Sequence, residues 1–340
     1  MDTVVEAPRK SQTPNERGRE QSAGNSNQRP DVLMVRPYAQ WAIDMLAATY
    51  QIHRLWEAAD PAAFVAERAS RIRAIATDAV IGFKADLIDA LPNLEVICSN
   101  GAGTDSLDLE AAKRRGIPVT NTPGVLAGDV ADLAVALAIS VIRRMRAADA
   151  YIRSGEWARR GTMEFVPRFF GRRVGIAGLG HIGRAVAKRL SGFDAEIGYF
   201  DIAPRPDVPY TFFDDLVALA TWCNLLIVTL AGGPSTHKIV TAPVFEALGP
   251  DGYFVNVSRG FIVDEPPLLD ALENHRIAGA GLDVFWNEPN NDARFLALDN
   301  VVLYPHHGSG TAEARKAMLE LVRDNLAAHF SGRPLLTPVV

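Results

Sequence analysis

A glycine-rich turn lies between an apolar segment and a helical one, and this order restricts the possible folds more than any other feature. Residues 178–183 read Gly-Leu-Gly-His-Ile-Gly and directly follow the apolar run 174–177. After a strand, the first glycine permits a sharp bend, the second lets a phosphate approach the backbone, and the third lets the next helix pack closely. The helix would add free N–H groups and the positive end of its dipole. The turn therefore predicts a dinucleotide-binding α/β unit.

An acidic residue beyond the glycine turn supports this interpretation. Asp201 ends the next expected strand, close to the spacing of ~20 residues at which such folds bind an adenosine ribose. A carboxylate there accepts the 2′- and 3′-hydroxyl protons and repels a 2′-phosphate. Arg205 follows shortly after and could pair with that phosphate instead. We expect NAD as the cofactor, with NADP the less favoured alternative.

Segments of strand and helix character alternate along the chain. The expected strands comprise residues 31–35, 79–81, 96–99, 118–119, 173–177, 197–201, 225–230, 252–257, 279–284 and 301–304. The expected helices comprise residues 41–50, 109–115, 129–152, 183–190, 214–220 and 312–330. Alternation of this kind predicts parallel sheets, and 340 residues are about twice a usual domain length of ~150. We expect two doubly wound, Rossmann-like α/β domains, each with a parallel sheet and helices on both faces, and a cleft between the domains.

The bulk composition argues against several classes of protein. Hydrophobic residues make up 48% and charged residues 22%, as in soluble globular proteins. The formal net charge of −5 gives no broad basic surface, so no nucleic-acid partner is expected. The longest apolar stretch, residues 131–142, falls well short of the ~20 residues of a membrane span.

Cysteine usage and the N-terminal residues bear on the compartment. Cys98 and Cys223 are too few for a disulfide framework or a cysteine-rich metal site, which fits a reducing cytoplasm. Residues 1–29 are polar and lack the apolar segment of a secretory signal, so they are expected to form a mobile tail.

Three polar side chains follow expected strands of the second half of the chain. Arg259, Glu288 and His306 come after the segments 252–257, 279–284 and 301–304. Ligands of open parallel sheets lie beyond the carboxyl ends of the strands, so these side chains are expected to converge. Arginine offers a planar fork for a carboxylate, and an imidazole supported by a carboxylate is suited to acid–base work near neutral pH. Asp283 could accept a hydrogen bond from a nicotinamide carboxamide.

Each of these residues also has an ordinary interpretation. An arginine after a strand is often a surface ion pair, and a Glu-Pro pair often begins a turn. His306 and His307 raise a metal site as an alternative, but no third ligand is evident, and we expect no metal. Four further polar residues are interpreted as solvated or helix-capping: Asp105, Asp108, His237 and His275.

Together these segments resemble the D-isomer-specific 2-hydroxyacid dehydrogenase family, from about Leu94 to the C-terminus. The resemblance depends most on residues 178–183, 256–260, 281–289 and 305–309, where the family carries its arginine, glutamate and histidine. The glyoxylate/hydroxypyruvate and hydroxyphenylpyruvate reductase branch is most similar, through residues 121–126, 129–132 and 332–338. That branch often has Arg, Gly and Ile at the positions of His181, Ser258 and His307, and these departures bear on cofactor choice. Its NADP-dependent members usually have Ser-Arg in place of Asp201-Ile202, which again favours NAD.

The resemblance implies the interconversion of a small 2-keto acid and its D-2-hydroxy acid by hydride transfer. Arg259 would bind the substrate carboxylate and carbonyl, and His306 would act as general acid and base with support from Glu288. The backbone N–H groups of Ala102 and Gly103 would also bind the carboxylate. The implied cofactor contacts are Gly178, Leu179, Gly180, His181, Ile182, Gly183, Asp201, Thr229, Leu230, Ala231, Val257, Arg259, Asp283, His306 and Gly308.

The resemblance also implies a domain arrangement and an assembly. Residues 30–125 and 309–340 would form the substrate domain and residues 126–308 the dinucleotide-binding domain, with hinges near Leu126 and Gly308. The long helix from Asp129 would form a homodimer, and the pocket wall would include Glu156, Trp157, Phe165 and Phe169. The alternative from another class is an NAD-sensing, protein-binding module, because corepressors share this fold.

Overall fold

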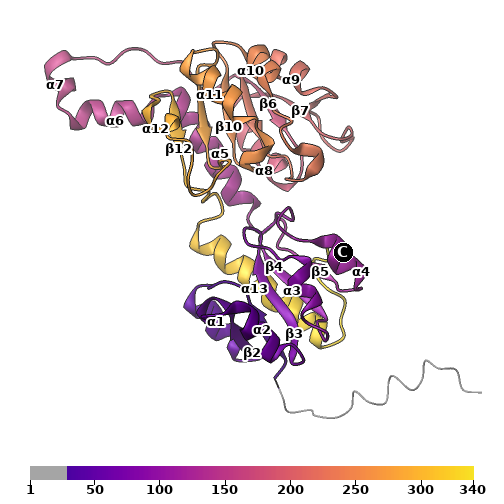
Figure 1. The fold of residues 1–340 in the computed structure, drawn as a ribbon. Helices are drawn as coiled ribbons and strands as arrows, with labels where there is room; N and C mark the ends of the chain where they lie inside the picture. Colours follow the sequence, from indigo (N-terminus) through magenta and orange to yellow (C-terminus); the bar gives the residue numbers. More distant parts are fainter. Residues whose placement is uncertain (1–28) are drawn as a thin grey trace, which may run out of the picture.

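The computed structural model describes residues 29–340, in which the chain forms two parallel sheets with helices on both faces (Figure 1). The predicted tail, residues 1–29, lies outside the described residues except for Arg29. The chain passes from the first sheet to the second before residue 127 and returns after residue 303. The fold class expected from the sequence is confirmed, whereas the domain bounds given above stay a prediction.

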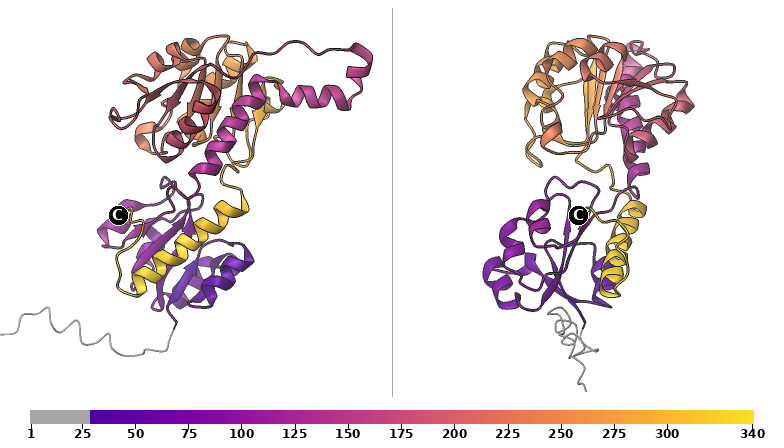
Figure 2. Two further views of the ribbon diagram at one scale, coloured as in Figure 1. Left: turned by 180° about the vertical axis from the view of Figure 1, so that it is seen from behind. Right: turned by 90° about the vertical axis from the view of Figure 1, so that its right-hand side faces the viewer.

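The first sheet has the strand order β2-β1-β3-β4-β5, and all its pairings are parallel. Its strands are β1 (Asp31–Met34), β2 (Gln51–Arg54), β3 (Ile72–Asp78), β4 (Val96–Asn100) and β5 (Val119–Thr120). Its helices are α1 (Gln40–Ala47), α2 (Pro61–Arg68), α3 (Ala85–Asp89), α4 (Leu109–Arg114) and α13 (Ala312–Phe330). Successive strand residues point to opposite faces, so Leu33 joins one buried cluster and Val32 and Met34 join another. Helix α13 covers the second of these faces (Figures 1 and 2).

The second sheet has the order β12-β11-β10-β9-β6-β7-β8 and is also parallel throughout. Its strands are β6 (Arg173–Ala177), β7 (Glu196–Phe200), β8 (Thr211–Phe213), β9 (Leu225–Val228), β10 (Tyr253–Asn256), β11 (Gly279–Leu282) and β12 (Val301–Leu303). One face is covered by α5 (Ala127–Ile142) and α8 (His181–Leu190), and the other by α9 (Leu216–Trp222), α10 (Ala242–Leu248) and α11 (Glu265–Glu273). The short helix α12 (Arg294–Ala297) precedes β12. The strand order reverses between β6 and β9, where such folds bind their ligands.

A helical arm extends from the second sheet and departs from the sequence prediction. The expected single helix 129–152 is two helices, α5 and α6 (Met145–Arg153), followed by α7 (Glu156–Arg160). Arg144 interrupts them with a left-handed backbone, φ 47°. The buried stripe ends at Ile142, and neither α6 nor α7 has a buried residue. The arm therefore projects from the body of the molecule (Figure 2).

Other differences concern the first sheet. The expected strand at residues 79–81 is wrong, because these residues form a turn after β3 in which Val80 and Ile81 are exposed. Strand β3 itself was not predicted, since Arg73 interrupts its apolar run. No helix within residues 29–340 has the length and apolar character needed to cross a bilayer.

Candidate active site

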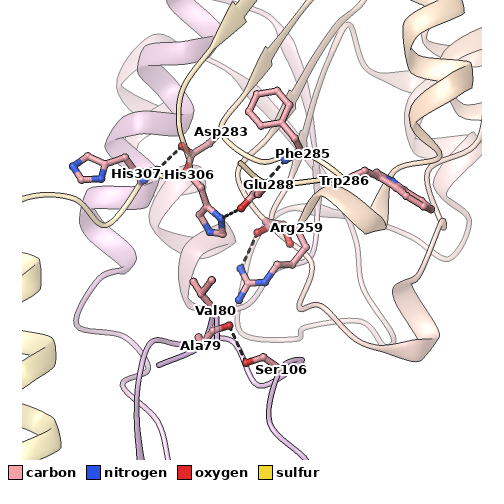
Figure 3. Close-up of polar contacts among 12 residues, drawn as sticks. Ala79, Val80, Ser106, Arg259, Asp283, Phe285, Trp286, Glu288, His306 and His307 are labelled. Carbon is pink, nitrogen blue, oxygen red and sulfur yellow. Dashed lines mark hydrogen bonds and ion pairs between the residues drawn. The ribbon is translucent and has the colours of Figure 1, made fainter. Parts of the chain in front are cut away.

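The three side chains predicted to act together do converge, and two of them are directly bonded. His306 follows β12, and its Nδ1 lies 2.5 Å from Oε2 of Glu288. The other oxygen of Glu288 accepts a hydrogen bond from the N–H of Phe285 at 2.8 Å, which fixes the carboxylate (Figure 3). With Nδ1 engaged, Nε2 is the imidazole nitrogen left to exchange a proton with a ligand.

The environment of Glu288 keeps its side chain ionised. Burial raises the pKa of this carboxyl group. The hydrogen bonds from His306 and Phe285 and the charges of His306 and Arg259 lower the pKa by more than burial raises it. The net result is a pKa below the ordinary glutamate value. Glu288 is thus a carboxylate that accepts from the imidazole and does not compete for its proton.

Arg259 follows β10 and reaches across to the first sheet. Its Nη1 donates to the carbonyl of Ser258 at 2.9 Å, and its Nε lies 3.1 Å from Oδ1 of Asp105. A side chain added at Gly103 would overlap the guanidinium. The interpretation of Asp105 as a solvated or capping residue is therefore wrong, since its side chain is only 16% exposed and pairs with Arg259.

The other three residues of that group behave as the sequence suggested. Asp108 caps α4 by accepting from the N–H of Ala111 at 3.0 Å, and His237 and His275 are exposed. Within residues 29–340, no group of three or more His, Cys, Asp or Glu side chains is placed to hold a metal ion.

The loop after β4 presents two free backbone donors. Gly101 has φ 153°, and its N–H bonds the hydroxyl of Thr122 at 2.9 Å, while Asn121 bonds the carbonyl of Ala102 at 2.8 Å. These bonds hold the loop in place. The N–H groups of Ala102 and Gly103 have no acceptor among the described residues, and both residues line the cavity that contains Arg259 and His306. The arrangement fits a carboxylate, which would accept from both N–H groups and from the guanidinium.

The glycine turn has the geometry that a dinucleotide requires. Gly178 has φ 96°, and Thr229 fixes its carbonyl through a 2.6 Å hydrogen bond. A Cβ at Gly183 would overlap that same carbonyl oxygen, so the close contact of α8 with the turn needs glycine there. At Gly180, by contrast, a Cβ would meet nothing within 4 Å, and no side chain caps the N-terminus of α8. This open space beside free N–H groups fits a pyrophosphate.

Asp201 follows the next strand and is bonded from several sides. Its Oδ2 accepts from the N–H of Leu179 at 3.2 Å and from Nη2 of Arg205 at 2.9 Å, and its Oδ1 accepts from the N–H of Ile202 at 2.8 Å. The carboxylate is therefore fixed beside the glycine turn, where an adenosine ribose would lie. Arg205 covers it and is the group that a 2′-phosphate would meet.

Asp283 supports the segment that carries His306. Its two oxygens accept from the N–H groups of His307 and Gly308 at 2.8 and 3.0 Å, and its carbonyl accepts from the N–H of His306 at 2.7 Å. His306 itself has a left-handed backbone, φ 47°. Burial raises the pKa of the Asp283 carboxyl group despite these bonds. The side chain thus fixes the backbone of residues 306–308 through hydrogen bonds, and its remaining lone pairs could accept from a cofactor amide.

A cavity of about 630 Å³ between the two sheets contains Arg259, Glu288 and His306, a volume within the usual range for a ligand site, whereas Gly178, Gly180 and Asp201 are not among its lining residues. Nine of the residues predicted for the site line it: Ala102, Gly103, Ile182, Val257, Arg259, Asp283, Glu288, His306 and Gly308. Four residues predicted for the pocket wall do not line the cavity: Glu156, Trp157, Phe165 and Phe169. The first three belong to the arm or its exposed continuation, and Phe169 packs in the core. Further lining residues were not predicted, among them Arg36, Tyr38, Asp78 and Arg315.

Comparison with known proteins gives concordant results. Residues 135–308 match the family described as D-isomer specific 2-hydroxyacid dehydrogenase, NAD binding domain. The chain is 45% identical to the hydroxyphenylpyruvate reductase of Plectranthus scutellarioides, over 91% of this chain and 98% of the relative. It is 51% identical to a 2-hydroxyacid dehydrogenase structure from Ketogulonicigenium vulgare, with a TM-score of 0.89 over 92% of this chain and 99% of the other. It is 41% identical to the NADPH-dependent glyoxylate/hydroxypyruvate reductase of Sinorhizobium meliloti in complex with NADP, with a TM-score of 0.87 over 92% and 97% of the two chains.

Proposed function

This chain belongs to the D-isomer specific 2-hydroxyacid dehydrogenase family, and we propose that it reduces small 2-keto acids to D-2-hydroxy acids with a nicotinamide cofactor. One observation supports this most strongly. A guanidinium, a carboxylate-bound imidazole and two free N–H groups line the same cavity. The hydroxyphenylpyruvate and glyoxylate/hydroxypyruvate reductases among its relatives act on keto acids of this type.

The residues divide the work of the reaction between binding and proton transfer. Arg259 and the N–H groups of Ala102 and Gly103 bind the substrate carboxylate, and the guanidinium also polarises the ketone. A nicotinamide cofactor, when bound, would supply the hydride to C2. His306 donates a proton from Nε2 to the ketone oxygen, and Glu288 holds Nδ1 and stabilises the charged ring. In the reverse direction His306 takes this proton back.

For the cofactor we propose a preference for NAD over NADP. The fixed carboxylate of Asp201 suits ribose hydroxyls and disfavours a 2′-phosphate. Arg205 tempers this preference because it lies against the same carboxylate. The remaining predicted contacts, Leu179, His181, Thr229, Leu230 and Ala231, belong to the turn, to α8 or to the segment after β9.

We further propose a homodimer that forms through the arm. Met145, Ile152, Trp157 and Phe165 are large apolar side chains exposed on α6, α7 and the following segment, and Phe165 is 99% exposed. We propose that these exposed apolar side chains contribute to the dimer contact, since large exposed apolar surface marks interaction sites. The buried free thiols of Cys98 and Cys223 are consistent with the proposed cytoplasmic location. Neither the described residues nor the relatives named above support the protein-binding alternative.

Substitution of His306 tests the assignment. Because its backbone is left-handed, His306→Asn is preferable to alanine, since asparagine tolerates this conformation. We expect kcat for keto acid reduction to fall by ~100-fold or more, as loss of a general acid implies. His275→Asn is the matched control, because His275 is exposed and has φ 50°. Turnover of His306→Asn equal to that of the control would exclude the proposed role.

A further inference from the structure

The part of the cavity wall that belongs to the first sheet and α13 carries two arginines that the proposed reaction does not use. Arg36 follows β1, and Arg315 lies near the start of α13. Both line the same cavity as Arg259 and His306. Asp78, at the end of β3, also lines this cavity. We call these three residues the distal cation site, after the positively charged side chains of its two arginines.

The distal cation site carries one more positive charge than negative. Nη1 of Arg36 lies 2.7 Å from Oδ2 of Asp78. Oδ1 of Asp78 accepts from the N–H groups of Val80 and Ile81, both at 2.9 Å, so this carboxylate is fully engaged. Among residues 29–340, no carboxylate lies within ion-pair distance of Arg315 and no hydrogen bond engages its guanidinium. Arg315 is thus a half-buried cation beside another cation, without a counter-ion in the described part of the chain.

The surrounding groups do not neutralise Arg315. Tyr38 also lines this wall, but its hydroxyl donates to the carbonyl of Thr77 at 2.5 Å, and burial raises the pKa of the phenol well above its ordinary value. It therefore stays uncharged. Burial, followed by the charge of Arg36, lowers the pKa of Arg315, whereas Asp78 raises it. A ligand anion would relieve both unfavourable effects.

The position of this site relative to the reacting groups is set by the turn after β3. Ala79 and Val80 directly follow Asp78, and they line the same cavity as His306 and Arg259 (Figure 3). A keto acid whose C1 carboxylate is held by Arg259, Ala102 and Gly103 must direct its other end elsewhere in the cavity. The distal cation site provides charged groups elsewhere on the wall of this cavity.

We propose that Arg36 and Arg315 bind a second anionic group of the substrate, at the end remote from C1, and that the enzyme prefers keto acids with such a carboxylate or phosphate. This inference rests on the proposed function for the reaction itself. Beyond the proposed function, the inference names the charge at the far end of the substrate and the residues that recognise this charge.

Matched substrate pairs test the inference with the full chain. The pairs are oxaloacetate with 2-oxobutanoate, 2-oxoglutarate with 2-oxopentanoate, and 3-phosphohydroxypyruvate with hydroxypyruvate, so chain length and the type of anion vary separately. We expect kcat/KM to favour the anionic member of at least one pair by tenfold or more, as roughly one charge-assisted hydrogen bond provides. The pair with the largest ratio identifies whether a carboxylate or a phosphate is bound.

Variants then assign the effect to the distal cation site. Arg315→Met should lower this ratio at least ~10-fold, and Arg315→Lys, which keeps the charge, should lower it less. Arg114→Met is the control, because Arg114 is exposed on α4 away from the cavity. Preference for the uncharged member of every pair, or a ratio that Arg315→Met leaves unchanged, would overturn the inference while keto acid reduction itself persists. Failure to reduce any of the six compounds would instead overturn the proposed function.

Discussion

Two glycines of the same turn should respond in opposite ways to one added methyl group. At Gly180 the backbone has φ −78°, which alanine adopts readily, and the space beyond a Cβ is open. At Gly183 a Cβ would overlap the carbonyl oxygen of Gly178 and lie 3.0 Å from the hydroxyl of Thr229. Gly180→Ala therefore probes the space in which a pyrophosphate would lie, and Gly183→Ala probes the packing of α8 on the turn.

The structure fixes the expected magnitudes. For Gly180→Ala, the loss at a helix N-cap and the gain from restricting the unfolded chain oppose one another, so the free energy of unfolding should change by less than about 1 kcal/mol. Its methyl group would keep a phosphate from the backbone, and loss of that close approach should weaken cofactor binding ~10-fold or more. Gly183→Ala forces the backbone apart and should destabilise the fold by roughly 1–3 kcal/mol.

Two measurements separate these outcomes. Thermal unfolding without ligand should leave Gly180→Ala near the wild type and lower the Tm of Gly183→Ala by roughly 2–4 °C for each kcal/mol lost. Fluorescence titration with NADH and NADPH should show the binding defect of Gly180→Ala. Wild-type affinity for both cofactors in a correctly folded Gly180→Ala protein would refute the placement of the pyrophosphate.

Two further outcomes follow from the carboxylates. Asp201→Ala should weaken the binding of NADH at least ~5-fold more than the binding of NADPH in the same titration, because the ribose hydroxyls lose their acceptor and a 2′-phosphate loses a repelling charge. An equal loss of affinity for both cofactors would contradict the ribose contact. Because the folded pKa of Glu288 is lowered, its ionisation contributes stability above the ordinary value of 4.5 that is lost as pH falls through the lowered pKa. Urea unfolding of wild type and Glu288→Gln should accordingly differ most at pH 6 and converge towards pH 3, and a gap that widens with acid would contradict this sign.

The parts of the site that could be predicted depend on local sequence and on one topological rule. The glycine turn is readable because each glycine has a steric reason at a fixed spacing, and Gly178 and Gly183 satisfy those reasons in the structure. Arg259, Glu288 and His306 could be grouped because each follows a strand, and the carboxyl ends of parallel strands meet at one edge. The terminal helix 312–330 was predicted at its observed bounds because apolar residues recur along it at helical spacing.

The parts that could not be predicted depend on contacts between the two sheets. Asp105 stands 154 residues from Arg259 and has no local pattern that distinguishes it from a loop carboxylate. Arg315 has the spacing of a solvent-facing helical residue, and only the placement of α13 against the first sheet turns it towards the cavity. The break at Arg144 was missed for a related reason, since helical periodicity continues on both sides of a single left-handed residue.

The pairing of Arg259 with Asp105 has a mechanical consequence for the two sheets. Arg259 belongs to the second sheet and Asp105 to the loop after β4 in the first, so this ion pair spans the cavity. A substrate carboxylate held by Arg259 and by the N–H groups of Ala102 and Gly103 would span it in the same direction. Both contacts engage one guanidinium and one loop, so a bound substrate would strengthen a connection that the protein already makes. Closure of the cavity around a substrate would therefore be coupled to recognition of the carboxylate, the group common to every 2-keto acid.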